Sequence, residues 1–174
     1  VKNGKIHDIV SDTTYLSGYT KIDLKGHYIL PGLINMHVHL AGSGKPQKKQ
    51  RDNEKLVNTI MSTSLTRAIA YRMVAGFAKD ELLSGVTTIR TVGGLGDFDT
   101  RLRDEIKAGS KIGPRILASN QGISVPGELK MPPEMVRAVC EKAHADGYLV
   151  AAHVESPEGV RVALENGVDS IEHG

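Results

Sequence analysis

The stretch that decides the fold is Leu30-Pro31-Gly32-Leu33-Ile34-Asn35-Met36-His37-Val38-His39. Pro31 and Gly32 interrupt the chain, and the apolar run after them predicts a buried strand that ends in two histidines. Because side chains alternate along a strand, His37 and His39 are expected to point to the same side. Neutral imidazole is a common ligand for zinc, so the pair could bind one ion. Taken alone, such a pair is more often two ordinary, partly buried side chains.

Downstream of this stretch the chain repeats one pattern: a helical segment, a glycine and then an apolar strand. Strands are predicted at residues 86–92, 115–119, 148–154 and 168–172. Helices are predicted at 53–84 (one or two), 99–108, from Pro132-Pro133 to Gly147, and at 157–166. This pattern is typical of parallel βα units, so we expect an α/β protein. The apolar residues expected to face the core from the first helical segment are Leu56, Ile60, Leu65, Ile69, Met73 and Phe77.

The beginning of the chain has a different pattern, with short strand candidates joined by polar turns. Asn3-Gly4 is a hairpin-turn signal, and strands are expected at residues 5–10, 21–24 and 27–30. We therefore predict that residues 1–30 form part of a small β domain and that residues 31–174 form a βα domain.

Two further histidines are predicted to end strands, His153 and His173. In parallel α/β folds, functional side chains gather at the carboxyl ends of the strands. Four strand-end imidazoles together favour a metal site, where a bound ion would lower the pKa of water towards neutrality. The other histidines, His7, His27 and His144, are interpreted as structural, and Cys140 as a core residue on an apolar helix face.

Composition excludes several classes of partner. The formal charge is +2, from 22 Lys plus Arg against 20 Asp plus Glu, which is too balanced to predict binding to nucleic acid or anionic membranes. No apolar run approaches the ~20 residues of a membrane span, and the single cysteine allows no internal disulfide. We expect a cytoplasmic protein with a small-molecule substrate; the sequence leaves a homo-oligomer open.

At this point a family resemblance can be named. The stretch Leu30–His39 closely resembles the opening of the barrel in the amidohydrolase superfamily. Four further segments resemble the prolidase-like and imidazolonepropionase-related branch: Gly85–Arg90, Gly113–Ile116, Ala151–His153 and Gly167–Gly174. The resemblance implies a (β/α)₈ TIM-type barrel with a small β-sandwich built from both chain ends.

The same resemblance implies a metal-dependent hydrolase that cleaves a C–N bond by metal-activated water. It would hold one or two divalent ions, usually zinc. His37 and His39 would bind the first ion. His153 and His173 would bind the second. The expected substrates include Xaa-Pro dipeptides, acyl amino acids and cyclic imides.

The chain also departs from the family pattern. In binuclear members a carboxylated lysine at the end of the fourth strand bridges the metals, but here no lysine occupies such a strand. The segment near residues 120–131 is too short for the expected helix and strand, and Lys130 is expected in a loop. The general-base aspartate of the eighth strand would lie beyond Gly174. With 174 residues against ~250 for a complete barrel, an incomplete barrel is expected, and no catalytic residue is assigned.

Two other functions stay open from the sequence. One is a truncated, non-catalytic metal-binding fragment, which would lack both the lysine and the aspartate. The other is a metal-free α/β protein that binds a small molecule, with the histidines only lining its pocket.

Overall fold

A computed structural model describes residues 1–11, 17–42, 53–120, 122 and 131–173. Most of the short segment near 120–131, including Lys130, lies outside the described residues. The chain divides into two compact units, Val1–Pro31 and Gly32–Gly174. The helices and strands all belong to the second unit, in the order β1 (Leu33–Val38), α1 (Asn53–Met61), α2 (Ser64–Leu83), β2 (Val86–Thr91), α3 (Phe98–Lys107), β3 (Arg115–Leu117), α4 (Pro133–Ala145), β4 (Ala151–His153), α5 (Pro157–Glu165) and β5 (Ser170–Glu172). No described helix is long and apolar enough to cross a membrane.

The first unit contains the predicted turn but not the predicted strands. Asn3 and Gly4 both have positive φ, 53° and 73°, as a type I′ hairpin turn requires, and an antiparallel bridge joins Lys2 to Lys5. The strands expected at 5–10, 21–24 and 27–30 are wrong for the described residues, which have no strand there. A strand needs a partner for its backbone groups, and local alternation of side chains does not supply one. The predicted small sandwich domain remains a prediction.

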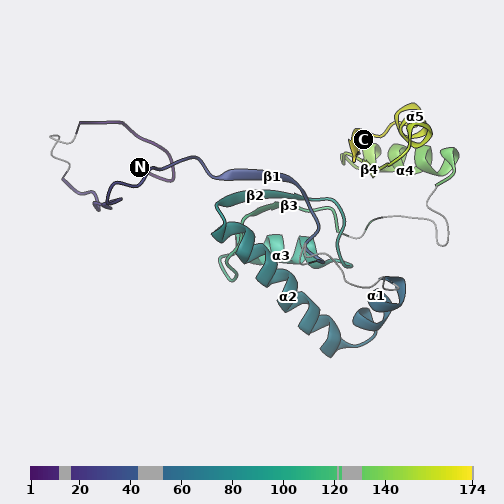
Figure 1. Ribbon diagram of the computed structural model, residues 1–174, viewed down its shortest axis with the longest axis horizontal. Helices are drawn as coiled ribbons and strands as arrows, with labels where there is room; N and C mark the ends of the chain where they lie inside the picture. The colour runs from purple at the N-terminus through teal and green to yellow at the C-terminus, as the bar shows by residue number, and fades with distance from the viewer. Residues whose placement is uncertain (12–16, 43–52, 121, 123–130, 174) are drawn as a thin grey trace. The chain divides into compact units, whose positions relative to one another are not determined.

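The first three strands form one parallel sheet in the order β1-β2-β3, as the helix–glycine–strand pattern predicted. Helices α2 and α3 both cover one face of this sheet (Figure 1). The core between them contains residues from every layer, including Ile89 of β2, Val74 and Ala78 of α2, and Leu102 of α3. The α/β class is therefore confirmed.

The buried face of α2 differs from the predicted one. Leu65, Ile69 and Met73 are exposed, and so is Leu56 on α1, although all four were expected in the core. The side chains that α2 buries are Ala70, Tyr71, Val74 and Ala78. Helix α2 carries apolar residues on more than one face, so helical spacing cannot select the face that the sheet covers.

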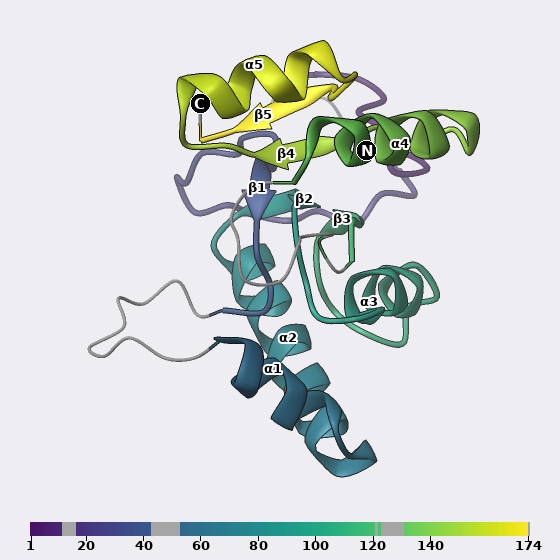
Figure 2. The same cartoon turned by 90° about the vertical axis from the view of Figure 1, so that its right-hand side faces the viewer.

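The last two strands form a second parallel sheet, β4-β5, with α4 and α5 packed against it (Figure 2). Cys140, Ala163 and Val168 are the buried residues of its core, which confirms the interpretation of Cys140 as a core residue. Burial raises the pKa of its thiol, which further disfavours a nucleophilic role. Both strands are shorter than predicted, because pairing covers only three residues of each.

Ile89 allows a direct test of this packing. Its side chain is 0% exposed at the centre of the first sheet, whereas Ile112 is 65% exposed. We expect Ile89→Ala to lower the free energy of unfolding by about 2–5 kcal/mol, because truncation leaves a cavity. The matched variant Ile112→Ala should change it by less than about 0.5 kcal/mol. Urea denaturation measures both, and equal effects would contradict the packing described.

Asp99, in the first turn of α3, is an acidic residue whose side chain is buried. It is 1% exposed, and neither carboxylate oxygen has a hydrogen-bond partner among the described residues. Burial raises the pKa of Asp99 above its ordinary value, and the nearby Thr91 hydroxyl, Asn120 backbone and His39 only partly oppose this. The folded state therefore binds its proton more tightly than the unfolded chain does.

This pKa shift predicts a pH-dependent effect of Asp99→Asn. As the pH rises past 3.8, the unfolded chain ionises Asp99 before the folded state does, so the wild-type protein loses stability that the variant keeps. The free energy of unfolding of Asp99→Asn should therefore increase, relative to that of the wild type, from pH 4 to pH 7. Asp104→Asn should show no such gain between these pH values, because the Arg103 guanidinium lowers the pKa of Asp104 and the contribution of that pair is lost only as the pH falls below 3.8. Urea denaturation at both pH values decides the signs.

Candidate metal centre

The histidines predicted at strand ends all lie at the carboxyl ends of parallel strands. His37 is the penultimate residue of β1 and His39 follows that strand directly. His153 is the last residue of β4, and His173 comes immediately after β5. Parallel pairing places these ends at the same edge of each sheet, which is where this class of fold collects its functional groups.

The four imidazoles lie close together. The ring centroid of His37 is 5.1 Å from that of His39, 5.3 Å from that of His153 and 4.6 Å from that of His173. The ring of His153 also lies 5.1 Å from His39 and 5.0 Å from His173. One ligand nitrogen from each of His37, His153 and His173 can be chosen so that all three lie within 4.8 Å of one another. We call the four residues the histidine cluster.

Hydrogen bonds orient the two β1 imidazoles. His37 Nδ1 lies 2.7 Å from Oε2 of Glu172, and His39 Nδ1 lies 3.1 Å from the carbonyl oxygen of Gly93. A carbonyl or carboxylate oxygen only accepts, so each Nδ1 is the donor and each Nε2 keeps its lone pair. Gly93 has a φ of 140°, and a Cβ there would lie 3.2 Å from the His39 ring, so this close approach requires glycine.

The other two histidines are held differently. His153 Nε2 donates to the carbonyl oxygen of Val92 over 2.8 Å, which leaves its Nδ1 lone pair available. His173 has a φ of 67°, in the left-handed region that non-glycine residues rarely adopt. Backbone strain of this kind concentrates at functional sites. The side chains of His39, His153 and His173 are exposed, so a ligand can reach the cluster.

Two charged residues that sequence reasoning missed complete the site. Glu172 is buried at the end of β5 and accepts hydrogen bonds from His37 and from Arg90 of β2. The His37 hydrogen bond and the Arg90 guanidinium lower the pKa of Glu172 to about 2, against the opposing effect of burial. The available signal was an arginine and a glutamate within segments predicted to be strands of a parallel sheet, where an unpaired buried charge would be costly.

The histidines interpreted as structural lie elsewhere. His144 on α4 pairs with Asp169, whose Oδ2 is 2.8 Å from its Nε2. His7 and His27 belong to the first unit, where both are exposed. His27 Nδ1 lies 2.7 Å from the Leu24 carbonyl oxygen.

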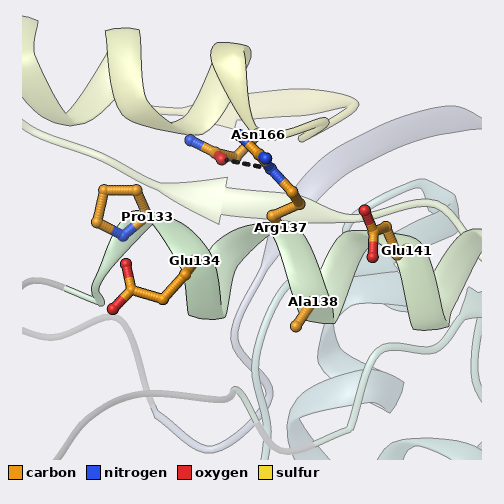
Figure 3. Close-up of a pocket in the computed structure, with 6 residues that line it drawn as sticks. All are labelled: Pro133, Glu134, Arg137, Ala138, Glu141 and Asn166. Carbon is orange, nitrogen blue, oxygen red and sulfur yellow. Dashed lines mark hydrogen bonds between the residues drawn. The ribbon is translucent and has the colours of Figure 1, made fainter.

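An open groove on the helical surface is not part of the histidine cluster. Figure 3 shows its lining on α4 and at the end of α5, where Arg137 Nε donates to Asn166 Oδ1 over 3.1 Å. The remaining lining residues are Pro133, Glu134, Ala138 and Glu141. No imidazole lines this groove, so we assign it no chemical role.

The donor set of the cluster fits a borderline divalent ion. Imidazole nitrogen suits zinc, copper, iron and nickel, whereas calcium and magnesium prefer oxygen ligands. The hydrogen bonds described above leave a nitrogen lone pair on each of His37, His39 and His153. These residues therefore meet the chemical requirement for a metal centre.

Comparison with known proteins adds the family. The model of the amidohydrolase family matches residues 28–129, more than half of the chain. The chain is 29% identical over 167 residues to the imidazolonepropionase of Klebsiella pneumoniae (strain 342), covering 86% of this chain and 38% of that protein. It is 31% identical over 121 residues to the imidazolonepropionase of Vibrio vulnificus (strain CMCP6), covering 62% and 29%. The chain thus spans less than half the length of these relatives.

Solved structures agree with this placement. A prolidase-like protein from Bifidobacterium longum is 32% identical, with a TM-score of 0.60 over 83% of this chain and 40% of that one. An amidohydrolase crystal structure superimposes with a TM-score of 0.74 over 100% of this chain and 55% of that one; at 20% identity it shows the α/β fold alone. Because the family model matches more than half of its residues, the chain belongs to the amidohydrolase family.

Proposed function

We propose that the full-length protein is a metal-dependent hydrolase that cleaves a C–N bond, with the histidine cluster as its metal centre. One observation carries the proposal: four imidazoles converge at the carboxyl ends of parallel strands, with three ligand nitrogens within 4.8 Å of one another. Histidines placed without a shared function would have no reason to meet at the ends of separate strands. Membership of the amidohydrolase family supports the reaction class. We also propose that the two parallel sheets are parts of one (β/α)₈ barrel.

Zinc is the proposed ion. In a tetrahedral zinc site with Zn–N bonds of ~2.1 Å, the ligand nitrogens lie about 3.4 Å apart, so nitrogens separated by as much as 4.8 Å would have to move closer together to bind one zinc. His153 and His173 are exposed and can make this adjustment by side-chain rotation. The cluster has enough ligands for one ion or, with further groups, for two.

The residues of the chain have separate roles in this proposal. A bound divalent ion would supply Lewis acidity and lower the pKa of water towards neutrality. His37 and His39 present Nε2, and His153 presents Nδ1, because their other nitrogens are engaged in hydrogen bonds. The side chains of His39 and His153 are exposed, so a substrate amide can approach the same point. The general base is not assigned to any residue.

The proposed substrates are small molecules with an amide or cyclic amide bond. Relatives and structural neighbours include imidazolonepropionases and a Xaa-Pro dipeptidase. A linear dipeptide and a cyclic amide each contain an amide C–N bond that a metal centre could cleave. They therefore define the two substrate classes to compare.

The metal centre can be tested by composition. We expect purified, zinc-replete protein to contain at least about one zinc per chain, and His37→Asn to lose most of it, because the variant lacks one of the imidazoles that would bind the ion. His7→Asn is the matched control, since His7 is exposed in the first unit and outside the cluster. Elemental analysis by mass spectrometry measures both. Equal zinc content in the two variants would contradict the assignment.

The reaction can be tested with a substrate panel. Zinc-loaded full-length protein should hydrolyse either Xaa-Pro dipeptides or cyclic amides, and His37→Asn should lower kcat/KM by on the order of 10²-fold or more, because the bound ion is lost. Release of the new amine or carboxylate is followed by liquid chromatography. Full zinc loading without hydrolysis of any panel member would favour a non-catalytic metal-binding protein instead.

A further inference from the structure

Glu172 occupies an unusual position, because a buried carboxylate connects three different strands. Its side chain is 8% exposed. Oε2 accepts from His37 Nδ1 of β1 over 2.7 Å, and Oε1 accepts from Arg90 Nη2 of β2 over 2.5 Å. Oε1 also lies 3.2 Å from the hydroxyl of Ser170, two residues earlier on β5. A buried charge is stable only with this kind of compensation.

Arg90 is itself fixed on both sides. Its Nε donates to the carbonyl oxygen of Met36 over 2.8 Å, and its Nη1 lies 3.4 Å from the Ser170 hydroxyl. Arg90 therefore holds the backbone directly before His37 and also the carboxylate that contacts the His37 ring. The planar guanidinium allows both contacts at once, which a lysine ammonium cannot reproduce in the same geometry.

His37 is thus held differently from its neighbours in the cluster. The rings of His39 and His153 donate to backbone carbonyls, of Gly93 and Val92. The ring of His37 instead donates to an ionised carboxylate. A carboxylate partner fixes the tautomer and orientation of an imidazole and makes its other nitrogen a stronger ligand. The rings of His37 and His153 each lie near the three other rings of the cluster.

We propose that Glu172 and Arg90 are positioning residues of the metal centre: Glu172 holds the Nδ1–H tautomer of His37 so that Nε2 binds the ion, and Arg90 holds Glu172 in place. The proposal rests on the proposed function, since it takes the histidine cluster as the metal centre. Neither residue contacts the ion or the substrate. Their effect passes through the imidazole of His37, so it is expressed in metal affinity.

The tautomer of His37 tests the proposal without any variant. Long-range ¹H–¹⁵N correlation spectra of uniformly ¹⁵N-labelled, metal-free protein at pH 8 distinguish a protonated Nδ1 from a protonated Nε2. We expect His37 to be in the Nδ1–H form. A His37 ring that is protonated mainly at Nε2 would overturn the proposal, whatever the protein binds.

Metal affinity provides the second test. Glu172→Gln keeps the shape of the side chain but removes its charge. Arg90→Lys keeps the charge but removes the planar guanidinium. Competition with a chromophoric chelator should show a zinc Kd weakened by about 10–100-fold in both, the usual effect of losing a partner of a ligating histidine. Glu165→Gln is the matched control, because it breaks an exposed Arg–Glu pair with Arg161 on α5. Its Kd should match that of wild type.

The outcomes separate the two proposals. Zinc binding in wild type with an unchanged Kd in Glu172→Gln and Arg90→Lys would overturn the positioning roles and leave the metal centre standing. No zinc binding in wild type would overturn the proposed function itself. If a variant loses affinity, its His37 spectrum should also show a mixed tautomer population. Lost affinity with an unchanged His37 tautomer would assign the loss to general destabilisation and would overturn the positioning roles.

Discussion

Parallel strands bring their carboxyl ends to one edge of a sheet, and the rest of this structure depends on that constraint. Strands β1 and β2 pair in this sense, as do β4 and β5. Each strand then places its last residues at the same edge of its own sheet. The carboxyl ends of the two sheets also lie close to each other, since the ring centroids of His37 on β1 and His173 after β5 are 4.6 Å apart. The helices and glycines between the strands make this parallel return possible.

A second constraint follows from the first. Imidazoles that lie close together still need fixed orientations, because a ring that rotates freely does not present one particular nitrogen to a metal ion. Backbone carbonyls at the end of β2 orient His39 and His153. Glu172 orients His37, and the cost of burying its charge is offset by Arg90. The architecture that collects the histidines therefore also supplies the groups that orient them.

The sequence predicted much of the βα pattern, for identifiable reasons. Two local signals, the apolar run after Pro31-Gly32 and the repeated pattern of helix, glycine and strand, located the helices and strands that the structure describes in the second unit. Predictions that needed a distant partner did less well. The strands expected at 5–10, 21–24 and 27–30 are not formed in the described residues, and α2 buries Val74 rather than Met73. Pairing and burial depend on what the rest of the chain places nearby.

The sequence by itself indicated the α/β class and the four candidate histidines, because strand period and strand-end position are properties of a short segment. The family came from the resemblance of its motifs to those of known members. Only the tertiary structure decided how close the four rings lie and which nitrogen of His37, His39 and His153 keeps its lone pair. It also revealed Glu172 and Arg90 as partners across three strands. A hydrogen bond between side chains far apart in the chain depends on distances of a few tenths of an ångström, and only the folded backbone fixes these.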